Sequence, residues 1–531
     1  MNKSHKSDKP NFLFIICDQL RADHLGCYGN PVIRTPHIDG LAARGARFDR
    51  SYVAYPVCMP NRACLMTGQM ASDHRGINNG IPLDLEATTF VDVLAHHGYH
   101  TGLIGKSHLQ GYTPLDPMYG YIADDELAPP PEEMQDALRR SRWGEGYRIE
   151  RRIASGELAD EPYRDGFYGF QHIELVTRHA DFTDGHHLAW AERQRSDFKN
   201  LVGPDNALPD QQRQGPQAWR TAVPPELYST QFIAERSNAY ISEVADRDQP
   251  FFLQVSFTDP HHPFTPPGKY WDMYEPSDIP LPSSFGQITT PRLQQVHKLH
   301  ADGKHKRNGG FAMPVDADEA RTLLALTYGM ISFIDDAVGE ILAQLDARGL
   351  AENTVVVFMS DHGDLGADHG VMLKRMHHYQ GLIRVPTLWV EPSGASSVRS
   401  DLVSTIDFPT TILKRAGIQP FNGAMGRDLF SDSEPDGLVI EEQAGQPKPG
   451  QSNPPGLRTL VTRGHRMTLS PDDKFGELYD LANDPDENIN LFEDPNAAGT
   501  RTELMEIMLR RMMQLQSTSP LPPFAPSRAS H

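Results

Sequence analysis

Two continuous apolar runs of strand length, each followed by an aspartate, constrain the fold of this chain most strongly. The runs are Asn11–Cys17 and Thr354–Ser360, and Asp18 and Asp361 follow them directly. An unbroken apolar strand is buried on both faces, which is typical of the centre of a parallel sheet. In such α/β sheets ligands bind beyond the carboxyl ends of the strands. We therefore expect both aspartates at one functional edge of the sheet.

Helical segments alternate with apolar strands along the chain. Each pair consists of an amphipathic stretch followed by a short apolar run. The pairs are 88–98 with 100–105, 229–245 with 251–257, and 320–348 with 354–360. This alternation predicts an α/β fold in which helices sandwich a large, mostly parallel sheet.

The composition changes near residue 435, which divides the chain into two predicted domains. Residues 10–435 form the α/β domain, and within them residues 110–225 are rich in Pro, Gly, Glu, Arg and Trp without a steady period. We interpret that stretch as an insertion over the rim of the site. Residues 436–531 predict a smaller α+β domain with a Pro-rich tail. Its expected elements are strands at 458–462 and 465–469 and a helix at 502–514.

Charge excludes several classes of ligand. The chain has 50 Lys and Arg against 70 Asp and Glu, a formal net charge of −20, and its 38% hydrophobic content suits a large buried core. Nucleic acids and long polyanions such as polysulfated glycans need a basic footprint, and only a local basic groove would escape this balance. A small anion in a locally positive pocket fits the composition better.

The N-terminus and the cysteines indicate a compartment. The apolar stretch at 12–17 is too short for a signal peptide or a membrane span, and the residues before it are polar. The four cysteines all lie within the first 64 residues, a poor distribution for stapling a large fold. We therefore expect a cytoplasmic protein that has no membrane segment.

The segment Cys58–Gly68 carries the most specific chemical signal. It reads C-x-P-x-R-x-x-L-x-T-G and resembles the signature of the type I sulfatases over its whole length. The resemblance implies that a separate formylglycine-generating enzyme oxidises Cys58 to formylglycine. One hydroxyl of the hydrated aldehyde would attack sulfur, giving a covalent sulfo-enzyme, and the other would expel sulfate. Arg62, one helical turn further on, can fix the resulting oxyanion. The alternative, a buried structural cysteine, is our interpretation of Cys17, Cys27 and Cys64.

The same resemblance implies one divalent metal ion beside the nucleophile. Its ligands would be Asp18, Asp361, His362 and residue 58. Ser360–Asp364 resembles the S-D-H-G-D form familiar in the alkaline phosphatase superfamily, whose fold is the α/β sandwich predicted above. Two positions depart from the usual pattern, because Gln19 replaces a second Asp of some sulfatases and His362 replaces an Asn of many. Calcium prefers oxygen ligands, so a nitrogen ligand makes manganese an alternative to calcium.

Further polar residues complete the predicted site. The segment around Lys106 and His108 resembles the G-K-x-H-L motif of the sulfatases. The segment around His261 resembles their P-H-x-P motif. The resemblance implies that Lys106 and Lys374 bind the sulfate oxygens. It also implies that His108 accepts a proton, and that His261 contacts sulfate or protonates the leaving oxygen. Asn79 matches a substrate-side amide of choline-sulfatase-like members. His262, His377 and His378 have no such support, and we interpret them as incidental.

Two other functions compete with hydrolysis of a small sulfate ester. A phosphonate monoester or phosphodiester hydrolase of the same superfamily is compatible with His362, but such enzymes carry Tyr and Thr in place of Lys106 and His108. A scaffold protein that lacks the modification is disfavoured because the cysteine and the metal-binding acids are intact. We also expect a homo-oligomer, in which the tail at 520–524 clasps a neighbouring subunit.

Overall fold

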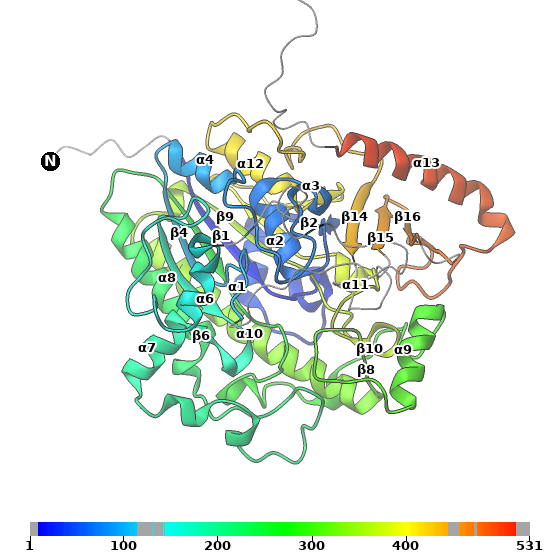
Figure 1. Cartoon of the computed structure of the whole chain (residues 1–531), viewed down its shortest axis with the longest axis horizontal. Coiled ribbons are helices and arrows are strands. Elements are labelled where there is room, and N and C mark those ends of the chain that lie inside the picture. Colours follow the sequence, from blue (N-terminus) through cyan, green and yellow to red (C-terminus); the bar gives the residue numbers. More distant parts are fainter. Residues whose placement is uncertain are drawn as a thin grey trace, which may run out of the picture.

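A sheet of nine strands forms the centre of the protein (Figure 1). The computed structural model describes residues 9–113, 131, 142, 144–443, 456–471 and 475–516. Across the sheet the strands are β12 (Ser397–Arg399), β2 (Ala46–Phe48), β11 (Thr387–Val390), β9 (Thr354–Ser360), β1 (Asn11–Cys17), β7 (Phe251–Ser256), β4 (His100–Gly105), β5 (His172–Thr177) and β6 (Asp184–Gly185). The strands from β9 to β5 are parallel, and β11 and β6 pair with them antiparallel. The predicted α/β fold is confirmed.

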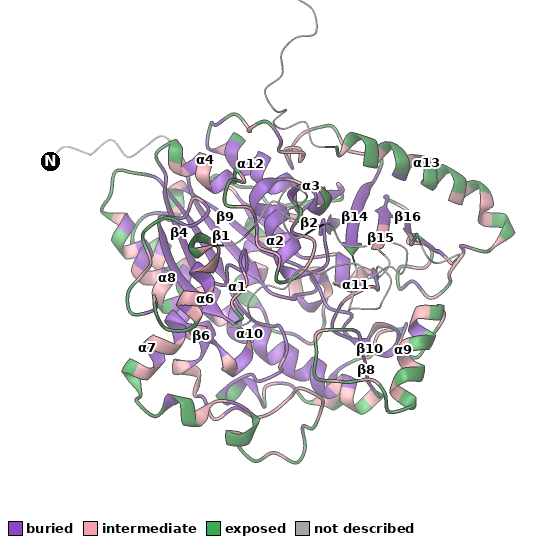
Figure 2. Cartoon of the chain, in the orientation of Figure 1, coloured by how far each residue is buried: buried purple, intermediate pink, exposed green. Residues whose placement is uncertain are grey.

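Strand β1 sits between β9 and β7, and its residues alternate between two helical layers. Leu13 and Ile15 face a core formed with helices on one side, and Phe12 and Phe14 face a second core on the other. The first layer consists of α1 (Pro36–Arg44), α7 (His186–Gln194), α8 (Ser229–Ala245) and α10 (Ala317–Ala347). The second consists of α2 (Cys58–Thr67), α4 (Phe90–His96), α6 (Ile149–Ala154) and α12 (Asp407–Arg415). Figure 2 shows the strands buried between them.

The register of the parallel strands brings their carboxyl ends to one level. Cys17 of β1 pairs with Ser360 of β9, and Gly105 of β4 pairs with Ser256 of β7. The residues that follow these strands therefore meet at one edge of the sheet.

Most predicted boundaries agree with the structure, and the exceptions have local causes. The strands at 11–17, 100–105 and 354–360 and the helix at 229–245 occupy the predicted residues. Helix α10 begins at Ala317, earlier than the predicted residue 320. There Asp316 and Glu319 form a capping box, in which each side chain accepts a backbone N–H of the other.

The interpretation of residues 110–225 as an irregular insertion is wrong for its central part, because β5 lies fully buried within the main sheet. Buried polar residues hid this strand from the apolar pattern. His172 Nε2 lies 3.0 Å from Glu174 Oε1, and Arg236 on α8 donates to both oxygens of Glu174. Part of the stretch, residues 114–130, 132–141 and 143, lies outside the described residues.

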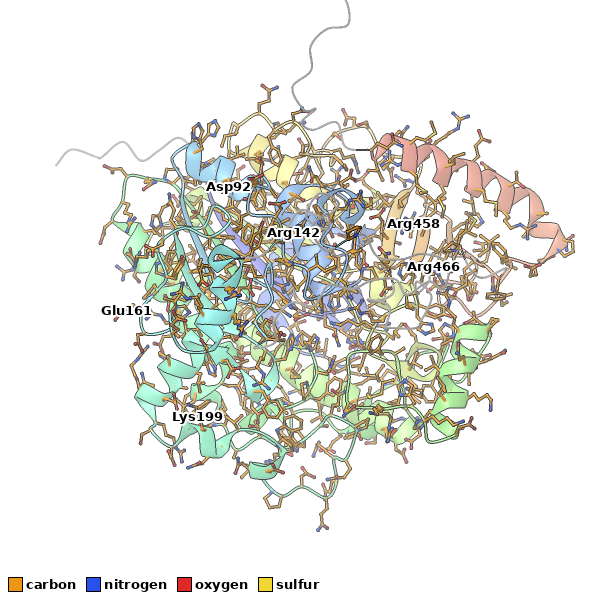
Figure 3. The ribbon with its side chains drawn as sticks, viewed as in Figure 1. Asp92, Arg142, Glu161, Lys199, Arg458 and Arg466 are labelled. Carbon is orange, nitrogen blue, oxygen red and sulfur yellow. The ribbon has the colours of Figure 1, made fainter. Side chains whose placement is uncertain are left out.

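A separate antiparallel sheet follows the main fold. Its strands are β14 (Leu438–Gln443), β15 (Gly456–Val461), β16 (His465–Leu469) and β17 (Glu477–Asp480), and helix α13 (Ala498–Gln514) packs against them. The predicted strands and helix are present, while the Pro-rich tail lies outside the described residues. Arg466 is buried in this sheet and pairs with Glu477 and Glu487 (Figure 3). The apolar side of the sheet packs against Cys64 of α2.

Among the helices of the described part of the chain, α10 alone is long and apolar enough to cross a membrane, by length and composition. Of the apolar 18-residue stretch in that helix, 89% is buried inside the protein. Helix α10 is therefore accounted for as a core helix that packs on α8.

Gly105 shows how the backbone fixes the sheet edge. Its φ is +105°, and an added Cβ would overlap the carbonyl oxygen of Ser256. We expect Gly105→Ala to lower the free energy of unfolding by about 3 kcal/mol or more, through combined strain and overlap. Gly98, with φ of +91° and open space around its Cβ position, is the matched control. Gly98→Ala should cost only about 1–2 kcal/mol. Equal losses of unfolding free energy in urea titrations would contradict this account.

Candidate active site

Cys58 begins helix α2 and is almost completely buried. Its Sγ lies 3.1 Å from His362 Nε2, 3.5 Å from Asp18 Oδ1 and 3.2 Å from Lys374 Nζ. Burial and the Asp18 carboxylate raise the pKa of this thiol, but Lys106, Lys374 and His362 outweigh them and lower it to about 7. A helix N-terminus adds a positive potential. The position therefore favours a nucleophile in its anionic form.

Asp18, which follows β1, is bound by a lysine and a histidine. The Lys106 ammonium forms an ion pair with Asp18 Oδ2, and His179 Nε2 lies 3.2 Å from the same oxygen. Burial alone would raise the pKa of Asp18, but Lys106, His261 and the hydrogen bond from His179 hold it well below its usual range. The buried carboxylate stays ionised because these neighbours compensate its charge.

Arg62 links helix α2 to the end of β9. Its Nε donates to Asp361 Oδ2 at 2.8 Å, and its Nη1 donates to the Lys106 carbonyl and to Ser256 Oγ. The Nη2 group is buried without a protein partner. Arg62 thus positions Asp361 and also leaves one donor free for an oxyanion.

Four donor atoms are arranged to hold a metal ion. They come from Asp18, Cys58, Asp361 and His362 and all lie within 4.8 Å of one another. The Nδ1–H of His362 donates to the Gly363 carbonyl at 2.8 Å, which leaves Nε2 as an acceptor that faces the cluster. Ligating histidines commonly make such an outer hydrogen bond. The donor set fits a divalent cation, as the sequence predicted.

Gln19 adds a second feature to the cluster. It has a positive φ of 69°, and its Nε2 donates to Asp364 Oδ2 at 2.5 Å. Its Oε1 is buried and has no hydrogen-bond partner. Burying an amide oxygen without a hydrogen-bond partner costs free energy, so this atom is suited to act as a ligand of a cation.

His108 and His261 lie in the same buried site. His108 follows β4 with φ of 56°, and its Nδ1 is buried without a partner. Burial and Lys106 hold the pKa of His108 well below its usual range, and burial, His179 and Lys374 do the same for the pKa of His261. His261 Nδ1 donates to the His262 carbonyl at 2.5 Å. Both imidazoles are therefore neutral near pH 7, and Nε2 of His261 is unprotonated.

The remaining predicted residues have mixed placements. Asn79 is exposed, and its Oδ1 accepts the Met59 N–H at 3.2 Å, so it caps α2 beside the nucleophile. His378 pairs with Glu442 at 3.0 Å, away from the donor cluster. His262, which we interpreted as incidental, lies beside the site. Its Nδ1 lies 3.2 Å from Gln19 Nε2, and its ring stacks on His261 with centroids 4.0 Å apart.

Sequence reasoning missed His179, which follows β5. Its Nε2 lies 2.8 Å from Lys106 Nζ, and its ring stacks on His261 with centroids 3.7 Å apart. The signal that could have found it is the strand before it, since a residue beyond a parallel strand reaches the same edge as Asp18.

The comparisons with known proteins agree with this geometry. The sulfatase family model matches residues 10–145 and 158–418. An uncharacterized sulfatase, YidJ, from Escherichia coli is 27% identical over 96% of this chain and 88% of its own. An arylsulfatase from Clostridium perfringens is 25% identical over 95% of this chain and 94% of its own. The structure of a phosphonate monoester hydrolase from Agrobacterium radiobacter shares the fold, with a TM-score of 0.74, 24% identity and coverage of 96% and 97%.

These matches define the class of protein: the chain is a sulfuric ester hydrolase of the alkaline phosphatase superfamily. Within that superfamily it belongs to the sulfatase family.

The contacts of His179 yield a prediction. We expect His179→Ala to lower kcat/KM for an aryl sulfate by about tenfold to a hundredfold, or about 1.4–2.7 kcal/mol, because Asp18 loses a hydrogen bond and His261 loses its stacking partner. His187, a buried histidine of α7 that bonds Thr183 and the Leu227 carbonyl, is the control. His187→Ala should lower stability in thermal unfolding and leave kcat/KM of the folded enzyme within about twofold. An unchanged kcat/KM in His179→Ala would contradict the role.

Proposed function

We propose that this protein hydrolyses small sulfate monoesters through a formylglycine at position 58 and one divalent metal ion. The observation that carries the proposal is the meeting of Asp18, His362 and Lys374 around Cys58 Sγ at the start of α2. We take that sulfur to mark the place of the nucleophilic oxygen in the modified residue. Residue 58 would be modified by a formylglycine-generating enzyme, which is the partner required for maturation.

The metal would be held by Asp18, Asp361, His362 and residue 58. We propose the unpaired Oε1 of Gln19, whose backbone N–H donates to Asp361 Oδ1, as a fifth donor of the kind that calcium and manganese both accept. When bound, the cation would lower the pKa of a hydroxyl on residue 58 and make it a better nucleophile. A nitrogen donor among oxygens favours manganese, and the choice between manganese and calcium stays a prediction.

Charge in the site supports a monoanionic substrate. Three cationic side chains, those of Lys106, Lys374 and Arg62, lie in the buried site, where Lys106 pairs with Asp18 and Arg62 pairs with Asp361. Lys106 and Lys374 flank Cys58 and can contact the oxygens of a sulfuryl group. Donors placed where charge develops stabilise the transition state.

His108 and His261 would carry out different proton transfers. His108 is neutral and has a free Nδ1, so it can accept the proton whose removal regenerates the aldehyde. His261 is also neutral in the structure, with an unprotonated Nε2. A bound sulfate would raise the pKa of His261 through its negative charge, and the protonated ring could then assist a poor leaving group.

An aryl or other small sulfate ester is the substrate class that we propose. The arylsulfatase relative covers most of the chain, and the net charge of −20 disfavours a polysulfated glycan. The exposed Asn79 lies at the outer side of the nucleophile, where the alcohol half of a substrate would enter. The four cysteine positions form no disulfide, and we propose a reducing, cytoplasmic location.

A second candidate function is hydrolysis of phosphonate monoesters or phosphodiesters. His362 is compatible with it, because a nitrogen ligand suits manganese and hydrolases of that type often depend on manganese. Lys106 and His108 favour the sulfatase function, since both lie in the site and replace the Tyr and Thr expected of a phosphonate hydrolase.

The first test concerns the nucleophile. We expect Cys58→Ala to abolish turnover without loss of folding, because it removes the reacting group but little buried volume. Activity of the wild type should rise in proportion to the aldehyde that mass spectrometry finds at residue 58, on co-expression with the generating enzyme. Cys64→Ala, a substitution in the same helix, is the control that should retain activity. Sulfatase activity in Cys58→Ala would overturn the mechanism.

The second test ranks substrates for the fully modified, metal-replete enzyme. We expect kcat/KM for sulfate monoesters to exceed that for phenyl phosphonate and phosphodiesters by at least about tenfold, or about 1.4 kcal/mol. His261→Ala should impair alkyl sulfates more than activated aryl sulfates, because only the former need protonation of the leaving oxygen. Lys106→Ala should impair both alike. The reverse ranking of substrates would assign the chain to the phosphonate hydrolases.

A further inference from the structure

Helix α13 presents an apolar stripe to solvent beside its own packing face. Leu504 and Met508 face inward against the antiparallel sheet and are 4% and 5% exposed. The outward stripe consists of Met505, Leu509, Met512 and Met513, which are 38%, 61%, 40% and 64% exposed. Their spacing of four, three and one residues places them on one face of the helix. Figures 1 and 2 show α13 exposed along one margin of the molecule.

One flank of the stripe carries opposite charges in a fixed order. Glu506 and Arg510 lie about 60° and 100° around the helix from Leu509, on the same side. Arg510 Nη2 donates to Glu506 Oε1 at 2.6 Å, and both side chains are exposed, at 71% and 60% for Arg510 and Glu506. The other flank of the stripe leads to Leu504 and Met508 and so to the body of the protein.

We propose that a second copy of this chain covers the stripe, with the two α13 helices packed antiparallel about a two-fold axis. In an antiparallel pair the same flank of each helix meets its counterpart with reversed direction. With the axis near Met508, Glu506 of one copy lies opposite Arg510 of the other, and the second such pair follows by symmetry. Met505 and Leu509 of one helix then pack against Leu509 and Met512 of the other.

Charge and sequence favour this occupant over two others. A membrane surface is disfavoured because Glu503 and Glu506 are mixed with the arginines of α13, whereas interfacial helices are rich in Lys and Arg on their polar face. The chain's own tail contains Pro520, Pro522 and Pro523, which cannot form a pairing helix. Neither alternative uses the ordered Glu506–Arg510 pair.

Sedimentation equilibrium of the full-length protein tests the pairing. We expect the wild type to dimerise at micromolar concentration, with twice the chain mass of 59.3 kDa. Leu509→Glu should weaken self-association at least about tenfold by placing charge at the centre of the interface. Val398 on β12 is equally exposed, at 61%, and Val398→Glu is the matched control that should remain dimeric. Both variants should keep the wild-type circular dichroism and sulfatase activity, because α13 does not contact the site.

Charge reversal tests the antiparallel register itself. Glu506→Arg and Arg510→Glu should each weaken the dimer, since like charges would then face each other across the two-fold axis. The double variant should restore association, because the opposite pairs re-form with exchanged signs. A monomeric wild type, or a dimer that Leu509→Glu does not weaken, would overturn the proposal. Failure of the double variant to recover would reject the antiparallel register.

Discussion

The ionised carboxylate of Asp18, buried at the end of β1, is the constraint on which the rest of the site depends. An isolated buried charge costs several kcal/mol, so the protein must supply compensating groups around it. Lys106 and His179 bind one oxygen, while Cys58 and His362 lie near the other. These partners come from β4, β5, α2 and β9, which explains why so many strand ends converge on one point. The same arrangement leaves donors free to meet an anion and a cation together.

The small antiparallel sheet contributes to the site from outside. Glu442 on β14 accepts the Met376 N–H at 2.8 Å and pairs with His378, so the loop that carries Lys374 is fastened to that sheet. Lys374 in turn reaches Cys58 Sγ. The sheet also packs on Cys64, on the far side of the helix that begins with the nucleophile. The second unit therefore helps to position both a lysine and the nucleophile, although it supplies no ligand of the cluster.

The site combines two chemical tendencies. Gln19 and His362 differ from the acid-rich set of many sulfatases, whereas Lys106 and His108 are the pair typical of that family. In the function that we propose, these two groups would act on different atoms of a substrate, because a bound metal would activate residue 58 and the lysines would bind the transferred group. Exchange of one metal donor would then change the metal without changing the preferred ester.

The sequence alone determined the α/β class and the aspartates at the strand ends, because buried strands are continuous apolar runs and their ends share one edge. The cysteine segment likewise predicted, by local residue type and spacing, the sulfatase family that the family model matches. Only the tertiary structure decided which distant groups meet there. His179 was missed because β5 buries a Glu–His–Arg network and so does not read as apolar. Lys374 lies 316 residues from Cys58, and their contact depends on long-range packing that no local pattern encodes.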